Sequence, residues 1–135
     1  MAGYSKRSLA EKLGIKEGFK IFLADPPENY NATLGQLPKN IEVVSRLDGP
    51  LDFIQFFCST RQKLEGKMPA LKHRLRPNGM IWISWPKGSS EVKTDLSENT
   101  VREIGLRNGL VDVKVCAVDQ TWSGLKFVYR LKDRS

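Results

Sequence analysis

The sequence has few of the residues that build disulfide frameworks, metal centres and catalytic triads. Its 135 residues include two cysteines and one histidine. Small secreted scaffolds are rich in cysteine, structural zinc sites use four cysteine or histidine ligands, and a catalytic triad places its histidine between a nucleophile and an acid. Cys58 and Cys116 lie inside apolar runs, and His73 lies among basic residues at the end of a helical pattern. We therefore predict reduced, buried thiols, a surface histidine and no metal site.

Long apolar runs are also absent. None approaches the roughly 20 residues that span a bilayer, and the polar first seven residues contain no signal-peptide core. The apolar share of 40% and the charged share of 27% are typical of a globular protein. We therefore expect a cytoplasmic protein without a membrane segment, folded as a single domain over residues 1–135.

Shorter apolar runs, rich in β-branched and aromatic residues, predict six strands, with helical patterns between most of them. The predicted strands are residues 21–24, 41–44, 51–57, 80–85, 111–118 and 125–131, and the helices are residues 8–13, 31–37, 59–75 and 97–107. Continuous apolar runs are typical of buried parallel strands, and the alternating pattern of the last two strands indicates an antiparallel hairpin. The sequence predicts a three-layer, Rossmann-like α/β domain whose mainly parallel sheet ends in that C-terminal antiparallel hairpin.

Local signals refine the boundaries of these elements. Ser8, Ser59 and Ser97 are placed to cap helices, and Pro69 predicts a break or kink in the third helix. Residues 76–79 predict a turn before the fourth strand, and residues 119–124 predict the turn of the final hairpin.

The carboxyl-terminal half, residues 51–131, resembles class I S-adenosylmethionine-dependent methyltransferases. The likeness lies in an apolar strand, a helix that ends in Leu-Arg-Pro-Asn-Gly at residues 75–79, a second strand, another helix and a terminal hairpin. The resemblance implies a Rossmann-like fold. None of these positions binds the cofactor in that family.

The amino-terminal half departs from the family at the cofactor positions. A glycine-rich turn normally follows the first strand, but here residues 25–30 read Asp-Pro-Pro-Glu-Asn-Tyr. Prolines lack the backbone N–H groups that such a turn presents. Residues 44–46, Val-Ser-Arg, replace the acidic end of the second strand, and the following helix and strand are missing. These departures imply a truncated domain with a degenerate cofactor site.

The whole chain also resembles a small bacterial protein family. Three segments carry this likeness: Gly-Tyr-Ser at residues 3–5, Trp-Pro-Lys at residues 85–87, and residues 113–125. The resemblance brings no activity with it.

Ligands of open α/β sheets bind beyond the carboxyl ends of the parallel strands. The predicted topology brings several aromatic and charged side chains to that edge, where two tryptophans and nearby cations would stack a planar ring and hold an anionic group. Alternatively, the tryptophans cap the core and the aspartates serve turns. The candidate ligand-binding residues are Asp25, Tyr30, Arg61, Trp85, Lys87, Asp119 and Trp122.

Two other features have a structural and a functional interpretation. Residues 25–27, Asp-Pro-Pro, resemble the substrate motif of amino-group methyltransferases, but they follow the first strand and also serve as a strand terminator. The net charge of +7 permits nucleic-acid contact, although no recognition module accompanies it. Its densest cluster, residues 61–76, equally forms a solvated helix face.

Three functional hypotheses follow. The first is a non-catalytic methyltransferase-like protein that has lost S-adenosylmethionine binding and has a binding or scaffold role, with a small molecule or a nucleotide as its ligand. The second is an active methyltransferase with an atypical cofactor loop, which would use Asp25, Trp85, Lys87 and Asp119. The third is a basic protein that associates with nucleic acid.

Overall fold

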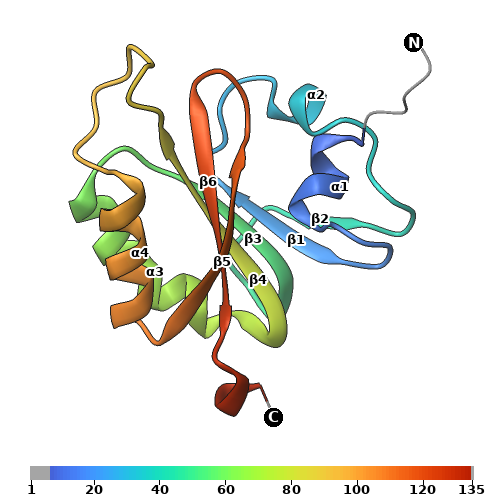
Figure 1. The fold of residues 1–135 in the computed structure, drawn as a ribbon. Helices are drawn as coiled ribbons and strands as arrows, with labels where there is room; N and C mark the ends of the chain where they lie inside the picture. The colour runs from blue at the N-terminus through green and yellow to red at the C-terminus, as the bar shows by residue number, and fades with distance from the viewer. Residues whose placement is uncertain (1–6, 135) are drawn as a thin grey trace.

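A six-stranded sheet forms the centre of the computed structural model, which describes residues 7–134 (Figure 1). The strand order is β2-β1-β3-β4-β6-β5. The first four strands are parallel, and β6 is antiparallel to both β4 and β5. The predicted fold class is therefore confirmed. The strands are β1 (Lys20–Ala24), β2 (Glu42–Val44), β3 (Leu51–Phe57), β4 (Leu75–Pro86), β5 (Leu110–Ala117) and β6 (Trp122–Tyr129).

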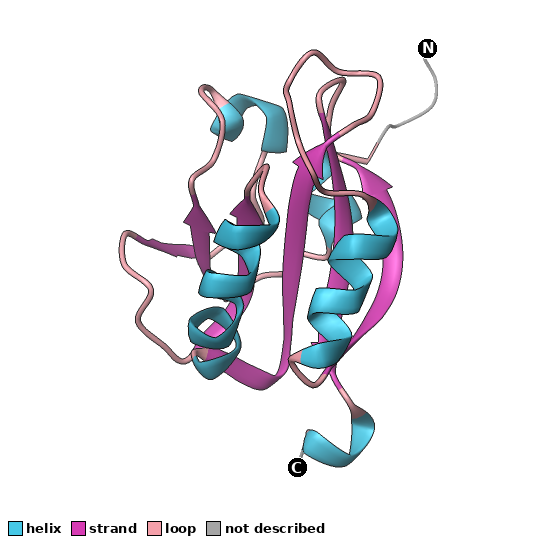
Figure 2. Cartoon of the chain, turned by 90° about the vertical axis from the view of Figure 1, so that its left-hand side faces the viewer, coloured by secondary structure: helices cyan, strands magenta, loops and turns pink. Residues whose placement is uncertain are grey.

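Helices cover both faces of the sheet. Figure 1 shows α1 (Leu9–Leu13) and α2 (Tyr30–Leu34) on one side, and α3 (Arg61–His73) and α4 (Glu98–Arg107) on the other. Figure 2 views the second side, where α3 and α4 lie side by side across the sheet. A short 3₁₀ helix, η1 (Leu131–Asp133), follows the last strand. None of the helices in the described range is long and apolar enough to cross a membrane.

Two apolar cores result, because side chains alternate between the faces of a strand. The core beneath α1 and α2 contains Phe53, Phe57 and Trp82, whereas the core beneath α3 and α4 contains Ile54 and Ile83. Trp82 joins the first core to α1, since its indole N–H donates to the carbonyl oxygen of Leu13 at 2.8 Å.

The predicted caps of α1 and α4 are confirmed. Ser8 Oγ accepts from the backbone N–H of Glu11, and Ser97 Oγ accepts from that of Thr100. Gly14 ends α1 in the left-handed conformation with φ of 92°.

The third helix differs from the prediction. Thr60, not Ser59, caps it by accepting from the Lys63 N–H. The helix runs as one piece through Pro69 and ends at His73 instead of residue 75. Proline removes one backbone hydrogen bond, but buried apolar side chains hold the helix on the sheet: Leu64, Met68 and Leu71.

The turn expected at residues 76–79 is also corrected. These residues lie within β4, which begins at Leu75 opposite Leu51. The register then shifts, so that Phe53 pairs with Met80 and the extra residues form an irregular bulge. In the final hairpin, β6 begins at Trp122, which shortens the turn predicted for residues 119–124.

The two cysteines differ in exposure. Cys58 is buried, as predicted, but Cys116 is partly exposed because it lies on the edge strand β5, and both thiols are free.

Candidate functional site

The topology places a crevice at the carboxyl ends of β1 and β3. The chain leaves β1 through α2 on one face and leaves β3 through α3 on the other face. Where neighbouring parallel strands send their connections in opposite directions, an open α/β sheet forms its ligand crevice. The groups that occupy this point therefore determine what the sheet can bind.

Tyr30 occupies the α2 side of the crevice. It is 3% exposed, and its ring packs edge-on against Phe57 with the ring centroids 4.8 Å apart. Phe57 in turn packs edge-on against Trp122 at 5.2 Å. Three aromatic side chains thus fill this side of the strand ends.

A buried hydrogen-bond chain anchors Tyr30. Its hydroxyl donates to Gln55 Oε1 at 2.6 Å, and Gln55 Nε2 donates to Ser84 Oγ at 3.0 Å. Gln55 and Ser84 are the two fully buried polar residues of the described chain, and no buried side-chain nitrogen or oxygen in that range lacks a partner. Because burial raises the pKa of the Tyr30 phenol well above its usual value, the phenol stays protonated and is not a general base.

The turn between β1 and α2 offers few backbone donors. Pro26 and Pro27 carry no N–H, and the Tyr30 N–H is bonded to the Pro27 carbonyl oxygen at 3.2 Å. Asp25 and Asn29 both have positive φ, 54° and 62°. The five-residue α2 therefore begins after a strained, proline-rich turn instead of a glycine-rich cradle.

The α3 side of the crevice is open. A groove of about 530 Å³ lies there, which we call the strand-end groove. Asp25 and Phe56 line it from the strand ends, and Lys63 and Lys67 contribute positive charge from α3. The lining residues are Asp25, Phe56, Gln62, Lys63, Gly66 and Lys67.

Cys58, which directly follows β3, is not an activated nucleophile. Burial, reinforced by the Asp25 carboxylate, raises the pKa of its thiol to about 12. A reactive cysteine needs the opposite shift.

The two tryptophans of the predicted ligand site lie on opposite faces of the sheet. Trp85 is buried in the core beneath α3 and α4, whereas Trp122 packs on the core beneath α1 and α2. Their strands pair Trp85 with Ser123 and Pro86 with Trp122, so the two indoles point in opposite directions. They do not form two walls around one planar ligand.

The turn between β5 and β6 brings Asp119 and the backbone of Lys87 beside Trp122, whereas Arg61 lies on α3. Asp119 Oδ1 accepts from the backbone N–H groups of Thr121 and Trp122, both at 2.8 Å, which is a turn-forming role. The Lys87 N–H donates to the Thr121 carbonyl oxygen. Arg61 is exposed on α3, with its guanidinium 3.9 Å from the Glu65 carboxylate.

Sequence reasoning missed Gln55 and Ser84. A usable signal was present, because each is a polar residue within a strongly apolar strand. Such residues are retained in a core when their polar atoms are paired.

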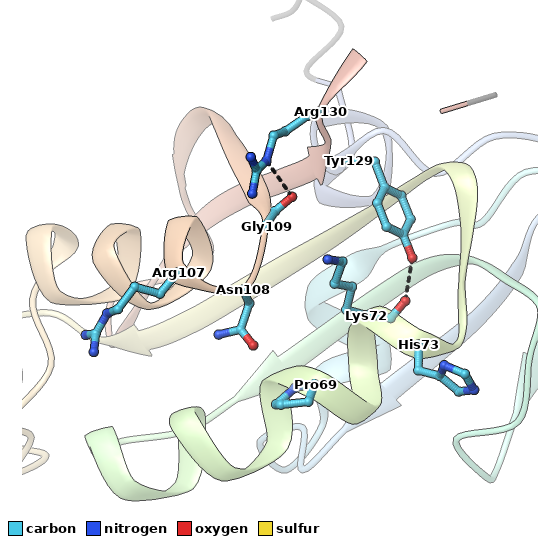
Figure 3. A pocket seen from close by; sticks show the side chains of 8 residues that line it. All are labelled: Pro69, Lys72, His73, Arg107, Asn108, Gly109, Tyr129 and Arg130. Carbon is cyan, nitrogen blue, oxygen red and sulfur yellow. Dashed lines mark hydrogen bonds between the residues drawn. The ribbon is translucent and has the colours of Figure 1, made fainter. Parts of the chain in front are cut away.

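A second cavity, of about 630 Å³, lies between the carboxyl ends of α3 and α4 and the end of β6 (Figure 3). We call it the basic cleft. Its lining includes no aspartate or glutamate and consists of Pro69, Lys72, His73, Arg107, Asn108, Gly109, Tyr129 and Arg130.

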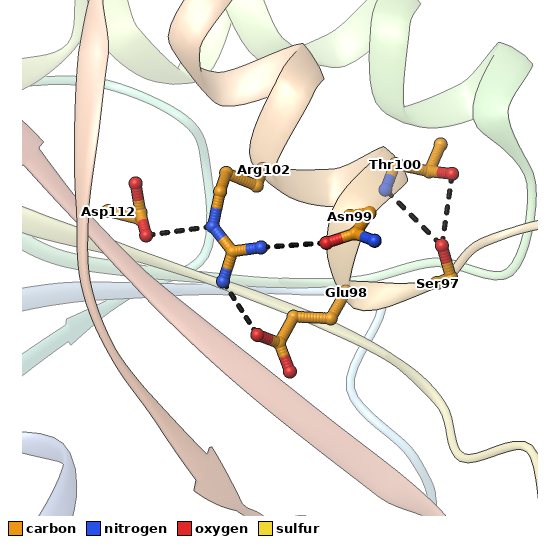
Figure 4. A network of polar contacts seen from close by, with 6 residues as sticks. All are labelled: Ser97, Glu98, Asn99, Thr100, Arg102 and Asp112. Atoms are coloured by element: carbon orange, nitrogen blue, oxygen red, sulfur yellow. Dashed lines mark hydrogen bonds and ion pairs between the residues drawn. The ribbon is translucent and has the colours of Figure 1, made fainter.

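A third polar cluster ties α4 to the edge strand (Figure 4). The Arg102 guanidinium donates to Asp112 at 2.9 Å, to Asn99 at 3.0 Å and to Glu98 at 2.6 Å. These acceptors raise the pKa of Arg102, mainly through Glu98 and then Asp112. Since each of the three guanidinium nitrogens has an acceptor, this cluster is structural. Within residues 7–134, no three histidine, cysteine or acidic residues are close enough together to hold a metal ion.

Comparison with known proteins connects the fold to one group of enzymes. No family profile and no curated protein matches the sequence. Among solved structures, a DhpI–SAH complex matches with a TM-score of 0.64 and 13% identity over 92% of this chain and 83% of its own. Precorrin-6y C5,15-methyltransferase from Geobacter metallireducens matches with a TM-score of 0.61 and 10% identity, over 90% of this chain and 86% of its own. A SAM-dependent methyltransferase from Aquifex aeolicus matches with a TM-score of 0.61 and 17% identity, over 87% of this chain and 85% of its own.

These matches extend the resemblance beyond the half predicted from sequence. They cover about nine-tenths of the chain, so the amino-terminal elements also follow this architecture. The predicted likeness to a small bacterial family stays a prediction, and its residues 3–5 lie outside the described range. The chain has the Rossmann-like fold of class I S-adenosylmethionine-dependent methyltransferases.

Proposed function

We propose that this protein is a methyltransferase-fold binding protein that does not use S-adenosylmethionine. The observation that carries the proposal is Tyr30, which is buried at the carboxyl ends of β1 and β3 and held there by Gln55. A ligand that entered on the α2 side would have to displace this ring and leave a buried amide oxygen without its donor. That loss costs about 1–3 kcal/mol before any new contact forms.

The other groups near the crevice support the same proposal. Methyltransferases of the family that the chain resembles have a glycine-rich turn after the first strand and an acidic residue at the end of the second strand. In this chain Pro26 and Pro27 stand in place of the glycines, and Val44 stands in place of the acidic residue. A cofactor with a ribose and a positively charged sulfonium gains little from prolines and an apolar side chain. The residues present therefore do not fit S-adenosylmethionine.

The binding role falls to the strand-end groove. It is open, it lies at the crevice that this fold uses for ligands, and Lys63 and Lys67 line it. These features favour a small molecule with an anionic group, in agreement with the small-molecule or nucleotide ligand expected from the sequence.

Isothermal titration calorimetry with S-adenosylmethionine and S-adenosylhomocysteine tests the proposal. We expect no saturable heat from either compound, with a functional methyltransferase in the same buffer as the positive control. Micromolar binding of either compound would overturn the proposal.

A variant pair identifies the site if binding does appear. Under the alternative hypothesis of an active enzyme with an atypical loop, Asp25→Asn abolishes binding, because Asp25 directly follows β1 and lines the groove. Asp133→Asn removes the same charge from the exposed η1 and leaves binding unchanged. Loss in the first variant alone would establish a working cofactor site at the strand ends.

A further inference from the structure

The basic cleft lies at the opposite end of the sheet from the crevice. It is formed by the last turns of α3 and α4 together with the end of β6, beside η1, whereas α2 lies at the other end (Figures 1 and 3). Nothing in the proposed function uses it.

Two cationic side chains from distant parts of the chain meet in this cleft. A Cβ built at Gly109 would lie 2.7 Å from Lys72 Nζ and 3.2 Å from Arg130 Nη2. Both nitrogens therefore border the same point and are close neighbours. Within residues 7–134, no carboxylate lies within 4.0 Å of either side chain.

Gly109 keeps this space open. It follows α4 with φ of 83°, a left-handed conformation that favours glycine. Any side chain here would also meet the Lys72 ammonium.

The helix ends do not balance the charge. Each helix carboxyl terminus carries roughly half a negative charge, so two termini offset about one unit. The cleft holds three basic side chains, Lys72, Arg107 and Arg130. Arg107 has a weak partner, because its guanidinium lies 3.9 Å from the Glu65 carboxylate. A second carboxylate, that of Asp133, lies near Tyr129. Among the residues that the structure describes, the positive charge at Lys72 and Arg130 remains unpaired.

The two cations are also held in place. Arg130 Nε donates to the Gly109 carbonyl oxygen at 3.1 Å, which leaves its terminal nitrogens free to bind. Lys72 Nζ lies 5.8 Å from the centre of the Tyr129 ring, and the Tyr129 hydroxyl donates to the Lys72 carbonyl oxygen at 2.6 Å (Figure 3). Preorganised donors lose less freedom when they bind.

We propose that Lys72 and Arg130 bind a phosphate group in the basic cleft. An arginine fork and a lysine ammonium are the side chains that recognise phosphate oxygens. The Tyr129 ring is already covered by Lys72, so the cleft offers no aromatic platform for a base and recognition rests on the phosphate. Two sources carry this chemistry: a small phosphate ester, and the backbone of a nucleic-acid strand. Exposed cations that follow lining residues closely in the sequence, namely Arg74, Lys132 and Arg134, would attract the further phosphates of such a strand.

Amide-resolved NMR titration of the full chain with inorganic phosphate, at ionic strength matched with sodium chloride, tests the site. We expect saturable shifts of the Gly109 and Arg130 amides, and an affinity about tenfold lower in Lys72→Gln, the loss of one charged hydrogen bond. Lys93→Gln, which removes the same charge from an exposed loop, is the matched control. Arg130→Lys is the second variant, because it keeps the charge and removes the fork. The absence of saturable shifts, or equal affinity in Lys72→Gln and Lys93→Gln, would overturn the proposal.

Fluorescence anisotropy with a labelled single-stranded oligonucleotide distinguishes the two sources. If the phosphate belongs to a nucleic acid, the oligonucleotide binds most tightly at low salt, displaces inorganic phosphate and loses affinity in Lys72→Gln. If inorganic phosphate binds and the oligonucleotide does not, the source is a small phosphate ester. The S-adenosylmethionine titration probes the other end of the sheet, so the two proposals fail independently.

Discussion

Gly105 and Gly66 are two helix-interior glycines for which the structure predicts opposite effects of alanine. Helix propensity alone predicts that Gly→Ala stabilises both α4 and α3, by about 0.5–1 kcal/mol. At Gly66 a new Cβ would meet nothing within 4 Å. At Gly105 it would fall on the ring of Phe127, with Cδ1 only 2.7 Å away and two further ring carbons nearer.

The structure sets the size of the difference. Phe127 is fully buried in β6, so its ring cannot move towards solvent. Overpacking a core in this way costs about 1–3 kcal/mol, which exceeds the gain in helix propensity. We therefore expect Gly105→Ala to lower the free energy of unfolding by about 1–2 kcal/mol and Gly66→Ala to raise it by up to about 1 kcal/mol.

Urea denaturation of the two single variants measures these changes. A double-mutant cycle then identifies the cause, because Phe127→Leu removes the ring that the new methyl group meets. In that background, Gly105→Ala should cost at least about 1 kcal/mol less than in the natural sequence.

Two results would refute this reasoning. The first is a Gly105→Ala protein at least as stable as the natural one. The second is an equal cost of Gly105→Ala with and without the Phe127 ring, which would place the effect outside this contact.

Three further predictions concern buried and bridging polar groups. Tyr30→Phe leaves the buried Gln55 oxygen without its donor and should lower the free energy of unfolding by about 1–3 kcal/mol in urea titrations, whereas an unchanged midpoint would mean that the amide finds another partner. Cys58 should react with a thiol reagent far more slowly than the partly exposed Cys116. Because burial raises the pKa of Cys58 from 9.0 to about 12, the free energy of unfolding should be unaffected below about pH 9 and fall as the pH rises towards 12. Cys58→Ala should reduce that loss. Arg102→Leu should lower Tm by removing the ion pair to Asp112, which joins α4 to β5, and the pair to Glu98 within α4. The difference from the natural protein should shrink at high salt, and a salt-independent difference would assign the effect to packing.

Local patterns in the sequence were sufficient for the fold class. Continuous apolar runs such as residues 51–57 are typical of parallel strands, and the capping serines at Ser8 and Ser97 mark helix starts without reference to distant residues. The errors arose where distant contacts outweigh local preference. Pro69 stays inside α3 because the helix packs on the sheet, and residues 76–79 join β4 because a bulge absorbs them.

The candidate site shows the same division. Composition and order placed Asp25, Tyr30, Trp85 and Trp122 near strand ends, which follows from where the apolar runs stop. Only strand register decided that the two tryptophans face opposite cores, because a shift of one residue reverses the face.

Distances between remote residues were likewise set by tertiary structure. Tyr30 bonds to Gln55, which lies 25 residues further along the chain. Lys72 and Arg130 both lie beside Gly109, although the three residues come from separate parts of the chain. By itself, the sequence determined the order of strands and helices, since hydrophobic periodicity and caps are local. The tertiary structure decided which side of the crevice is filled and which cleft gathers unpaired charge, because packing and register depend on contacts between residues far apart in the chain.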